Sequence, residues 1–156
     1  MFQPGEIVLY RLFLAQVDEI KEERYILHSI ESADCYYEVP LANKYRHLQA
    51  LPDCDESDGL LKSLLHLPTL SIPHNAVDRF CKSILDSYDL RQWLMLLKTL
   101  FIDKINAEST GRKFVDSKKY YYKILFERMV TIFSFTMHKE KAMITQNLNT
   151  ILTDSR

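Results

Sequence analysis

The segment Leu51-Pro52-Asp53-Cys54-Asp55-Glu56-Ser57 decides how the chain divides, because the hydrophobic pattern differs on its two sides. The segment itself is polar and acidic and contains a proline, which is typical of a linker. Before it, apolar residues occur in short runs and at alternate positions, as in β-strands. After it, they recur at the helical period. The sequence therefore predicts an α+β chain, with a β domain over residues 1–52 and an all-α domain of about five helices over residues 53–156.

Four or five short strands fit into the first 50 residues. The first is an apolar run that follows a Pro-Gly turn. Tyr37, Val39 and Leu41 are expected on one face of a later strand, because strand side chains alternate. So many short strands in so short a segment predict a small β-barrel rather than a sandwich. The expected strands are residues 7–10, 14–20, 24–30, 35–41 and 46–50.

Five helices are expected beyond the linker. The clearest begins at Leu90, because apolar residues follow one helical face and Asp89 can cap the first turn. Ser57 is the expected N-cap of the first helix, and residues 106–115 are expected to form a loop. The expected helices are residues 57–66, 75–86, 90 to about 105, 116–138 and 140–152.

Composition places the chain among ordinary folded domains. Of its 156 residues, 47% are hydrophobic and 26% are charged. No apolar run reaches the roughly 18–20 residues that span a bilayer, and the first residues lack the pattern of a signal peptide. Cys35, Cys54 and Cys81 form no CxxC pair, so neither a disulfide framework nor a zinc module is expected. These features predict a cytoplasmic protein without a membrane partner.

The small net charge of −1 conceals an asymmetry along the chain. Residues 1–58 carry five basic and twelve acidic side chains, whereas residues 59–156 carry fifteen basic and nine acidic ones. An excess of basic residues in one half points to phosphate backbones as a partner. Ordinary solvated faces explain the same numbers equally well, so both interpretations stay open.

No catalytic constellation is found, so neither enzymatic activity nor a cofactor, metal or small-molecule substrate is expected. With only three glycines, the chain has no glycine-rich phosphate loop. His74 and Cys81 are seven residues apart, but Cys81 lies on an apolar helix face, where a buried inert thiol is usual. Trp93 lies among leucines and is expected in the core. The acids between residues 53 and 58 lack the EF-hand pattern and fit a solvated linker better.

One group of basic residues is concentrated enough to indicate a partner. Its five members lie within 12 positions and are interleaved with tyrosines. Lysines at the start of a helix oppose the macrodipole, so helix stability does not account for them. They therefore predict contacts with DNA phosphates, which position a protein without reading sequence. The candidates are Arg112, Lys113, Lys118, Lys119 and Lys123, with Arg79 and Lys82 as a second tier.

Several motifs occur in one order along nearly the whole chain. The front half contains Met1-Phe2-Gln3-Pro4-Gly5-Glu6-Ile7-Val8-Leu9-Tyr10, Tyr37-Glu38-Val39-Pro40-Leu41 and Tyr45-Arg46-His47-Leu48. The helical half contains motifs at residues 84–90, 97–101, 111–120, 126–128 and 133–135. This order resembles the CarD-like bacterial transcription regulators, in particular the Firmicutes type.

The resemblance implies an SH3/Tudor-like barrel that binds the RNA polymerase β subunit through a sheet edge. Such binding uses main-chain hydrogen bonds, with side chains supplying selectivity. It also implies a helical domain that contacts promoter DNA beside the open bubble, and hence association with the nucleoid. By resemblance alone, the polymerase-binding residues are Tyr36, Tyr37, Glu38, Val39 and Arg46.

Three departures from the family pattern leave a second interpretation open. Residues 11–15 lack the glycines of the family's first turn, and Tyr88 stands where a glycine is usual. The tryptophan that the family places as a wedge at the bubble edge has no counterpart near His74. The alternative is a protein-only adaptor whose helical domain binds no DNA. The missing tryptophan favours the adaptor, and the basic cluster opposes it.

Overall fold

A computed structural model describes residues 1–156 and divides the chain into two compact units, Met1–Leu51 and Pro52–Arg156. The first unit is a five-stranded antiparallel sheet and the second contains five helices, so the chain is α+β. None of the helices combines the length and apolar character that crossing a membrane requires.

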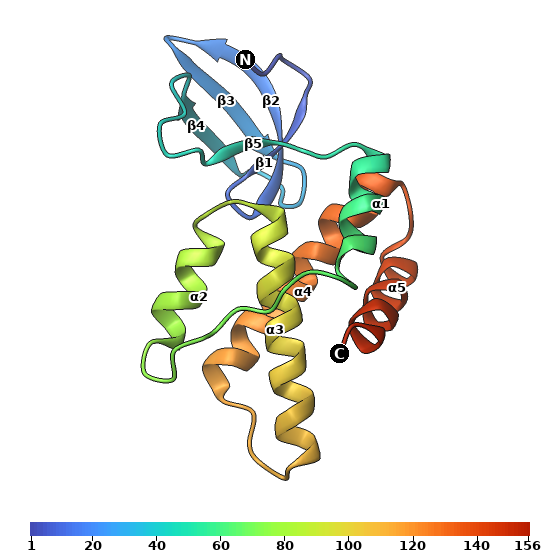
Figure 1. Ribbon diagram of the computed structural model, residues 1–156. Coiled ribbons are helices and arrows are strands. Elements are labelled where there is room, and N and C mark those ends of the chain that lie inside the picture. Colours follow the sequence, from blue (N-terminus) through green and yellow to red (C-terminus); the bar gives the residue numbers. More distant parts are fainter. The chain divides into compact units, whose positions relative to one another are not determined.

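The sheet has the strand order β4-β3-β2-β1-β5, and every neighbouring pair is antiparallel (Figure 1). Its core comes from alternate positions, among them Val17, Leu27 and Val39. The sheet is strongly curled. The curl brings the ring of Tyr10 on β1 against that of Tyr37 on β4, with centroids 4.6 Å apart, although these strands are not neighbours in the sheet. The strands are β1 (Ile7–Tyr10), β2 (Phe13–Lys21), β3 (Arg24–Ser29), β4 (Tyr36–Pro40) and β5 (Leu48–Ala50).

The small closed barrel is not found, because β4 and β5 remain the two edges of the sheet and do not pair. The expected strand at residues 46–50 is also shorter and begins at Leu48. Arg46 has a positive φ of 53°, which interrupts an extended backbone. The side-chain amide of Asn43 then bonds the backbone of Leu48 in both directions, at 2.8 and 3.2 Å. The strand β5 therefore begins only at Leu48 and is three residues long.

The turns form with few glycines, because other residues adopt the left-handed backbone region. Glu22 and Glu23 join β2 to β3 with φ of 50° and 61°, the pattern of a type I′ hairpin turn. Arg11, between β1 and β2, has φ of 55°, and Tyr88 has φ of 51°. Arg11 and Tyr88 thus adopt the left-handed backbone without being glycine.

In the helical unit, α4 contacts each of the other four helices (Figure 1). The apolar faces predicted for the third and fourth helices are buried, with Trp93, Leu97, Leu125 and Phe133 fully enclosed. The helices are α1 (Cys54–Ser63), α2 (Val77–Leu85), α3 (Leu90–Ser109), α4 (Asp116–Met137) and α5 (Lys141–Asp154).

The first helix differs most from its prediction. Asp53, not Ser57, is the N-cap of α1, because its carboxylate accepts a hydrogen bond from the Glu56 N–H at 2.8 Å. Ser57 is fully buried and donates its hydroxyl to Thr136 of α4 at 2.7 Å. A cap position was expected from the preference of serine for helix starts, but Asp53 satisfies the same need one turn earlier.

The other helix ends follow the prediction more closely. Asp89 caps α3 by accepting from the N–H groups of Arg91 and Gln92, as expected. The third helix continues to Ser109, into the segment that was expected to be a loop. It ends there because Gly111, with φ of 70°, turns the chain.

Candidate functional site

The outer edge of β4 presents backbone groups to solvent in a defined register. Ser29 N–H donates to the carbonyl of Cys35, and Leu41 N–H donates to that of Glu23. Antiparallel pairing alternates between bonded and non-bonded positions, so the groups of residues 35, 37, 39 and 41 point toward β3. The N–H and C=O groups of Tyr36 and Glu38 therefore point away from the sheet, whereas the carbonyl of Pro40 accepts the N–H of Asn43 at 3.0 Å.

The side chains predicted to bind the polymerase are not gathered on one surface. Tyr36 is 68% exposed, and Glu38 lies on the same outer face in an ion pair with Arg24 at 3.6 Å. Val39 is only 5% exposed and belongs to the sheet core. Tyr37 packs against Tyr10, and burial raises the pKa of its phenol. Of the four predicted residues on β4, only Tyr36 and Glu38 are thus displayed on its surface.

The fifth predicted residue, Arg46, is exposed but lies in the connection that leads into β5. That connection leads to the opposite edge of the sheet from β4. Tyr45 beside it is 71% exposed and stacks on His47 at 5.7 Å. Arg46 therefore lies on the connection between β4 and β5 and not on the edge strand itself.

The basic cluster lies on the α3–α4 connection and the first two turns of α4, and it divides into two groups. Lys113, Lys119 and Lys123 line one pocket. Arg112 and Lys118 line a smaller hollow of about 270 Å³, which His74 also lines. Lys113 and Phe114 line both hollows, so the two groups of cations are neighbours.

The cations differ in how firmly they are already paired. Lys118 binds Asp103 of α3 at 2.9 Å, and its side chain is only 16% exposed. Lys113 and Asp116 form an exposed pair at 3.5 Å, which contributes about 0–1 kcal/mol. Lys119 and Lys123 are exposed and form no ion pair. These two are the cluster's most available lysines.

The second-tier candidates lie elsewhere on the helical unit. Arg79 and Lys82 are exposed and three residues apart on α2, so they share one side of that helix. Neither lines the two hollows that contain the other five basic residues.

The pocket beside Lys119 and Lys123 was not anticipated from the sequence. It has a volume of about 550 Å³ and lies between the end of α3 and the start of α4. Its apolar lining comes from Phe114, Tyr122 and Phe126, and we call it the aromatic pocket. The four-residue spacing of Tyr122 and Phe126 on one helix face was the only signal in the sequence.

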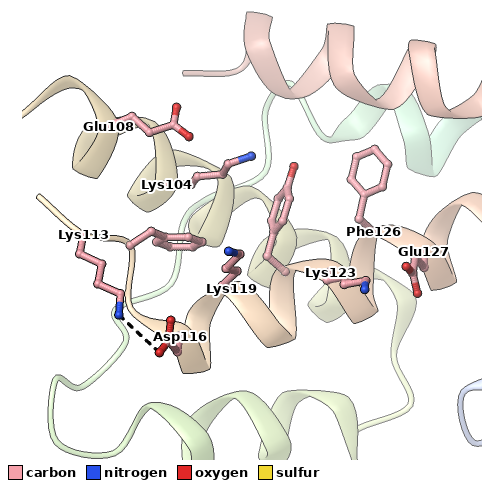
Figure 2. Close-up of a pocket in the computed structure, with 10 residues that line it drawn as sticks. Lys104, Glu108, Lys113, Asp116, Lys119, Lys123, Phe126 and Glu127 are labelled. Atoms are coloured by element: carbon pink, nitrogen blue, oxygen red, sulfur yellow. Dashed lines mark ion pairs between the residues drawn. The ribbon is translucent and has the colours of Figure 1, made fainter. Parts of the chain in front are cut away.

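Charged side chains surround the aromatic pocket, as Figure 2 shows. Lys104 and Glu108 come from α3, and the Lys104 ammonium lies 5.2 Å from the centroid of the Tyr122 ring. Burial and the nearby Glu108 carboxylate raise the pKa of Tyr122, so its phenol stays protonated and can donate. The remaining charges come from the connection and α4: Lys113, Asp116, Lys119, Lys123 and Glu127.

Two residues considered for chemistry belong to the interior. Cys81 is fully buried, and desolvation raises the pKa of its thiol to about 11. It is therefore a protonated thiol at neutral pH rather than a nucleophile. Trp93 is in the core, as predicted, and its indole N–H donates to the carbonyls of Ile84 and Leu85. In this structure Trp93 is not displayed as a surface wedge.

The structure brings no three His, Cys, Asp or Glu side chains together in an arrangement suited to a metal ion. What the fold defines is an α+β chain that combines an open, curled sheet with a helical unit. A scan against protein-family models finds no match for this chain. A search of curated proteins finds no relative either.

Proposed function

We propose that this chain is a CarD-like transcription regulator, whose sheet unit binds the RNA polymerase β subunit and whose helical unit contacts promoter DNA. In this proposal the curled sheet is the counterpart of the family's Tudor-like barrel, although its edge strands do not pair. Such a protein has no enzymatic activity and acts in the cytoplasm, at the nucleoid. The observation that carries the proposal is the open edge of β4.

The edge of β4 suits a partner strand because its hydrogen-bonding groups are ordered and unused within the sheet. Two N–H groups and two carbonyls, those of Tyr36 and Glu38, point outward in the register derived above. An extended segment of a partner can add to such an edge through main-chain hydrogen bonds. Tyr36 supplies an exposed ring at the beginning of the strand.

The substitution Glu38→Pro tests this docking mode. Proline removes the outward N–H of residue 38 but none of the hydrogen bonds to β3, and edge strands tolerate proline at such positions. Capture of purified β subunit by the full chain should fall about tenfold or more, as expected for loss of a main-chain bond at an interface. Glu38→Ala, which removes only the side chain, is the matched control and should retain binding. Equal capture by both variants and the natural chain would remove β4 from the interface.

The basic group around α4 supports the DNA part of the proposal. Lys119 and Lys123 are exposed and unpaired, and Arg112 is exposed on the preceding connection. Contacts of this kind give weak, salt-sensitive affinity that depends little on sequence.

The alternative is a protein-only adaptor, and two observations favour it. Trp93 is enclosed in the core. Lys118 is already neutralised by Asp103 at 2.9 Å. Retention of promoter DNA by polymerase complexes separates the two functions. Alanine at Arg112, Lys113, Lys118 and Lys119 should weaken retention if the helical unit binds DNA, and should leave it unchanged if the chain is an adaptor.

A further inference from the structure

The aromatic pocket has a composition that DNA contact alone does not explain. Phe114, Tyr122 and Phe126 are each partly buried, and together they line an open hollow of about 550 Å³. The rings of Tyr122 and Phe126 are tilted, with centroids 5.9 Å apart. Phosphate oxygens need cations and N–H donors, and they gain nothing from such a lining. The volume instead lies within the range of small-molecule sites, which are mostly apolar with a few polar groups.

The charges around the pocket leave a small positive excess. Four lysines face three carboxylates, and the Lys113–Asp116 pair removes one of each. Lys104 is held above the Tyr122 ring, 5.2 Å from its centroid. Glu108 and Glu127 remain against Lys104, Lys119 and Lys123, so one cation is in excess. A ligand with a single negative charge balances this excess.

Lys119 and Lys123 are positioned to meet such a ligand. They are one turn apart on α4 and line the same pocket (Figure 2). Neither takes part in an ion pair, so no existing contact has to break. The Tyr122 phenol lies in the same lining as a neutral donor. Apolar rings and free ammonium groups thus occur together at one place.

We propose that the aromatic pocket binds a small aromatic carboxylate, with its ring among Phe114, Tyr122 and Phe126 and its carboxylate held by Lys119 and Lys123. The chemistry is that of an amphipathic anion: the ring leaves water for an apolar lining, and the charge stays at the rim. The inference does not rest on the proposed function, because it requires neither DNA nor polymerase.

The test is calorimetric titration of the full chain with 1-naphthoate, compared with the uncharged 1-naphthalenemethanol. The carboxylate should bind about tenfold or more tightly than the alcohol, as expected for a charge-assisted contact. Backbone amide shifts in NMR spectra should move at residues 104–108 and 113–127. No naphthoate binding would overturn the proposal, as would equal binding of the two compounds.

The variant Lys119→Gln/Lys123→Gln should lose the preference for the carboxylate but keep the weaker binding of the alcohol. Both lysines are exposed, so the variant is expected to fold. Lys141→Gln, an exposed lysine at the start of α5, is the matched control and should bind as the natural chain does. Unchanged preference in the double variant would place the anion elsewhere. If a single-stranded oligonucleotide binds at the pocket and naphthoate does not, the pocket is a site for a nucleic-acid base, and the proposal is also overturned.

Discussion

Lys98 shows how a single residue can organise a segment that has no regular structure. It is 5% exposed, and its ammonium donates to the carbonyls of Leu64, Leu65 and Leu67 at 3.1, 3.3 and 2.8 Å. Burial lowers the pKa of this ammonium. The neighbouring Thr99 accepts the N–H of Leu70 at 2.8 Å. The end of α1 and the chain after it are therefore fastened to α3 by two adjacent side chains.

Lys98→Met should destabilise the protein by about 3 kcal/mol, because three carbonyls lose their donor and two of these bonds are buried. The free energy of unfolding in urea measures this effect. Lys62→Met is the control: Lys62 is 72% exposed and pairs only with Asp58 on the same helix, so its loss should cost less than about 1 kcal/mol. Similar losses of unfolding free energy in the two variants would mean that the Lys98 contacts stabilise the protein no more than an exposed ion pair does.

Cys81 predicts a specific dependence of stability on pH. Its pKa is raised from 9.0 to about 11 in the folded state by burial. Between these values the unfolded thiol ionises while the folded thiol keeps its proton, so unfolding releases a proton and becomes more favourable as pH rises. The natural chain should have a higher free energy of unfolding than Cys81→Ala. This difference should be constant below pH 9 and should decrease as the pH rises toward 11. Parallel stabilities of the two proteins across this range would contradict the prediction.

At the scale of the element, the β2–β3 hairpin carries backbone strain that can be relieved. Glu22 and Glu23 hold positive φ values of 50° and 61°, and the left-handed region costs L-residues about 1–2 kcal/mol each. Asn and Gly are the residues that type I′ turns prefer.

Glu22→Asn/Glu23→Gly should therefore stabilise the protein by about 1 kcal/mol, since the gain in the turn exceeds the added freedom of the unfolded chain. The midpoint of urea unfolding is the measurement. Glu22→Gln/Glu23→Gln removes the same two charges without changing the backbone preference. If this charge-neutral variant is stabilised as much, like-charge repulsion rather than conformation is the cause.

At the scale of the whole molecule, the structural boundary at Pro52 changes the net charge assigned to each unit. The acidic residues at positions 53–58 belong to the helical unit, since that unit begins at Pro52. Residues 1–51 then carry five basic and eight acidic side chains, and residues 52–156 carry fifteen basic and thirteen acidic ones. The asymmetry between the units is smaller than the linear count indicated. DNA binding is therefore expected to depend on a local group of lysines rather than on net charge.

Lys119→Ala/Lys123→Ala should weaken binding to a DNA duplex and lower the slope of log affinity against log salt by about 2, near 0.9 for each lost phosphate contact. Lys118→Ala should change the slope little, because Lys118 is paired with Asp103. Fluorescence anisotropy at several salt concentrations measures both slopes. An unchanged slope in the double variant would favour the adaptor function.

The sequence alone determined the features that depend on neighbouring residues. The change of hydrophobic period, the cap at Asp89, the buried face of α4 and the concentration of lysines are all local patterns. Each follows from a spacing of two to four positions, which sets the face on which a side chain lies. Strand and helix types were therefore predictable, and their ends were less so, because Asp53 and Ser57 both suit a cap.

Only the tertiary structure decided which distant groups meet. It placed Val39 in the core while leaving the edge of β4 open, and it paired Lys118 with Asp103, fifteen positions away. It also left the sheet unclosed. The aromatic pocket formed where three rings, from α4 and the connection before it, meet the end of α3. Local spacing cannot specify such pairs, because they depend on how the elements pack and on which partner a buried or charged group finds.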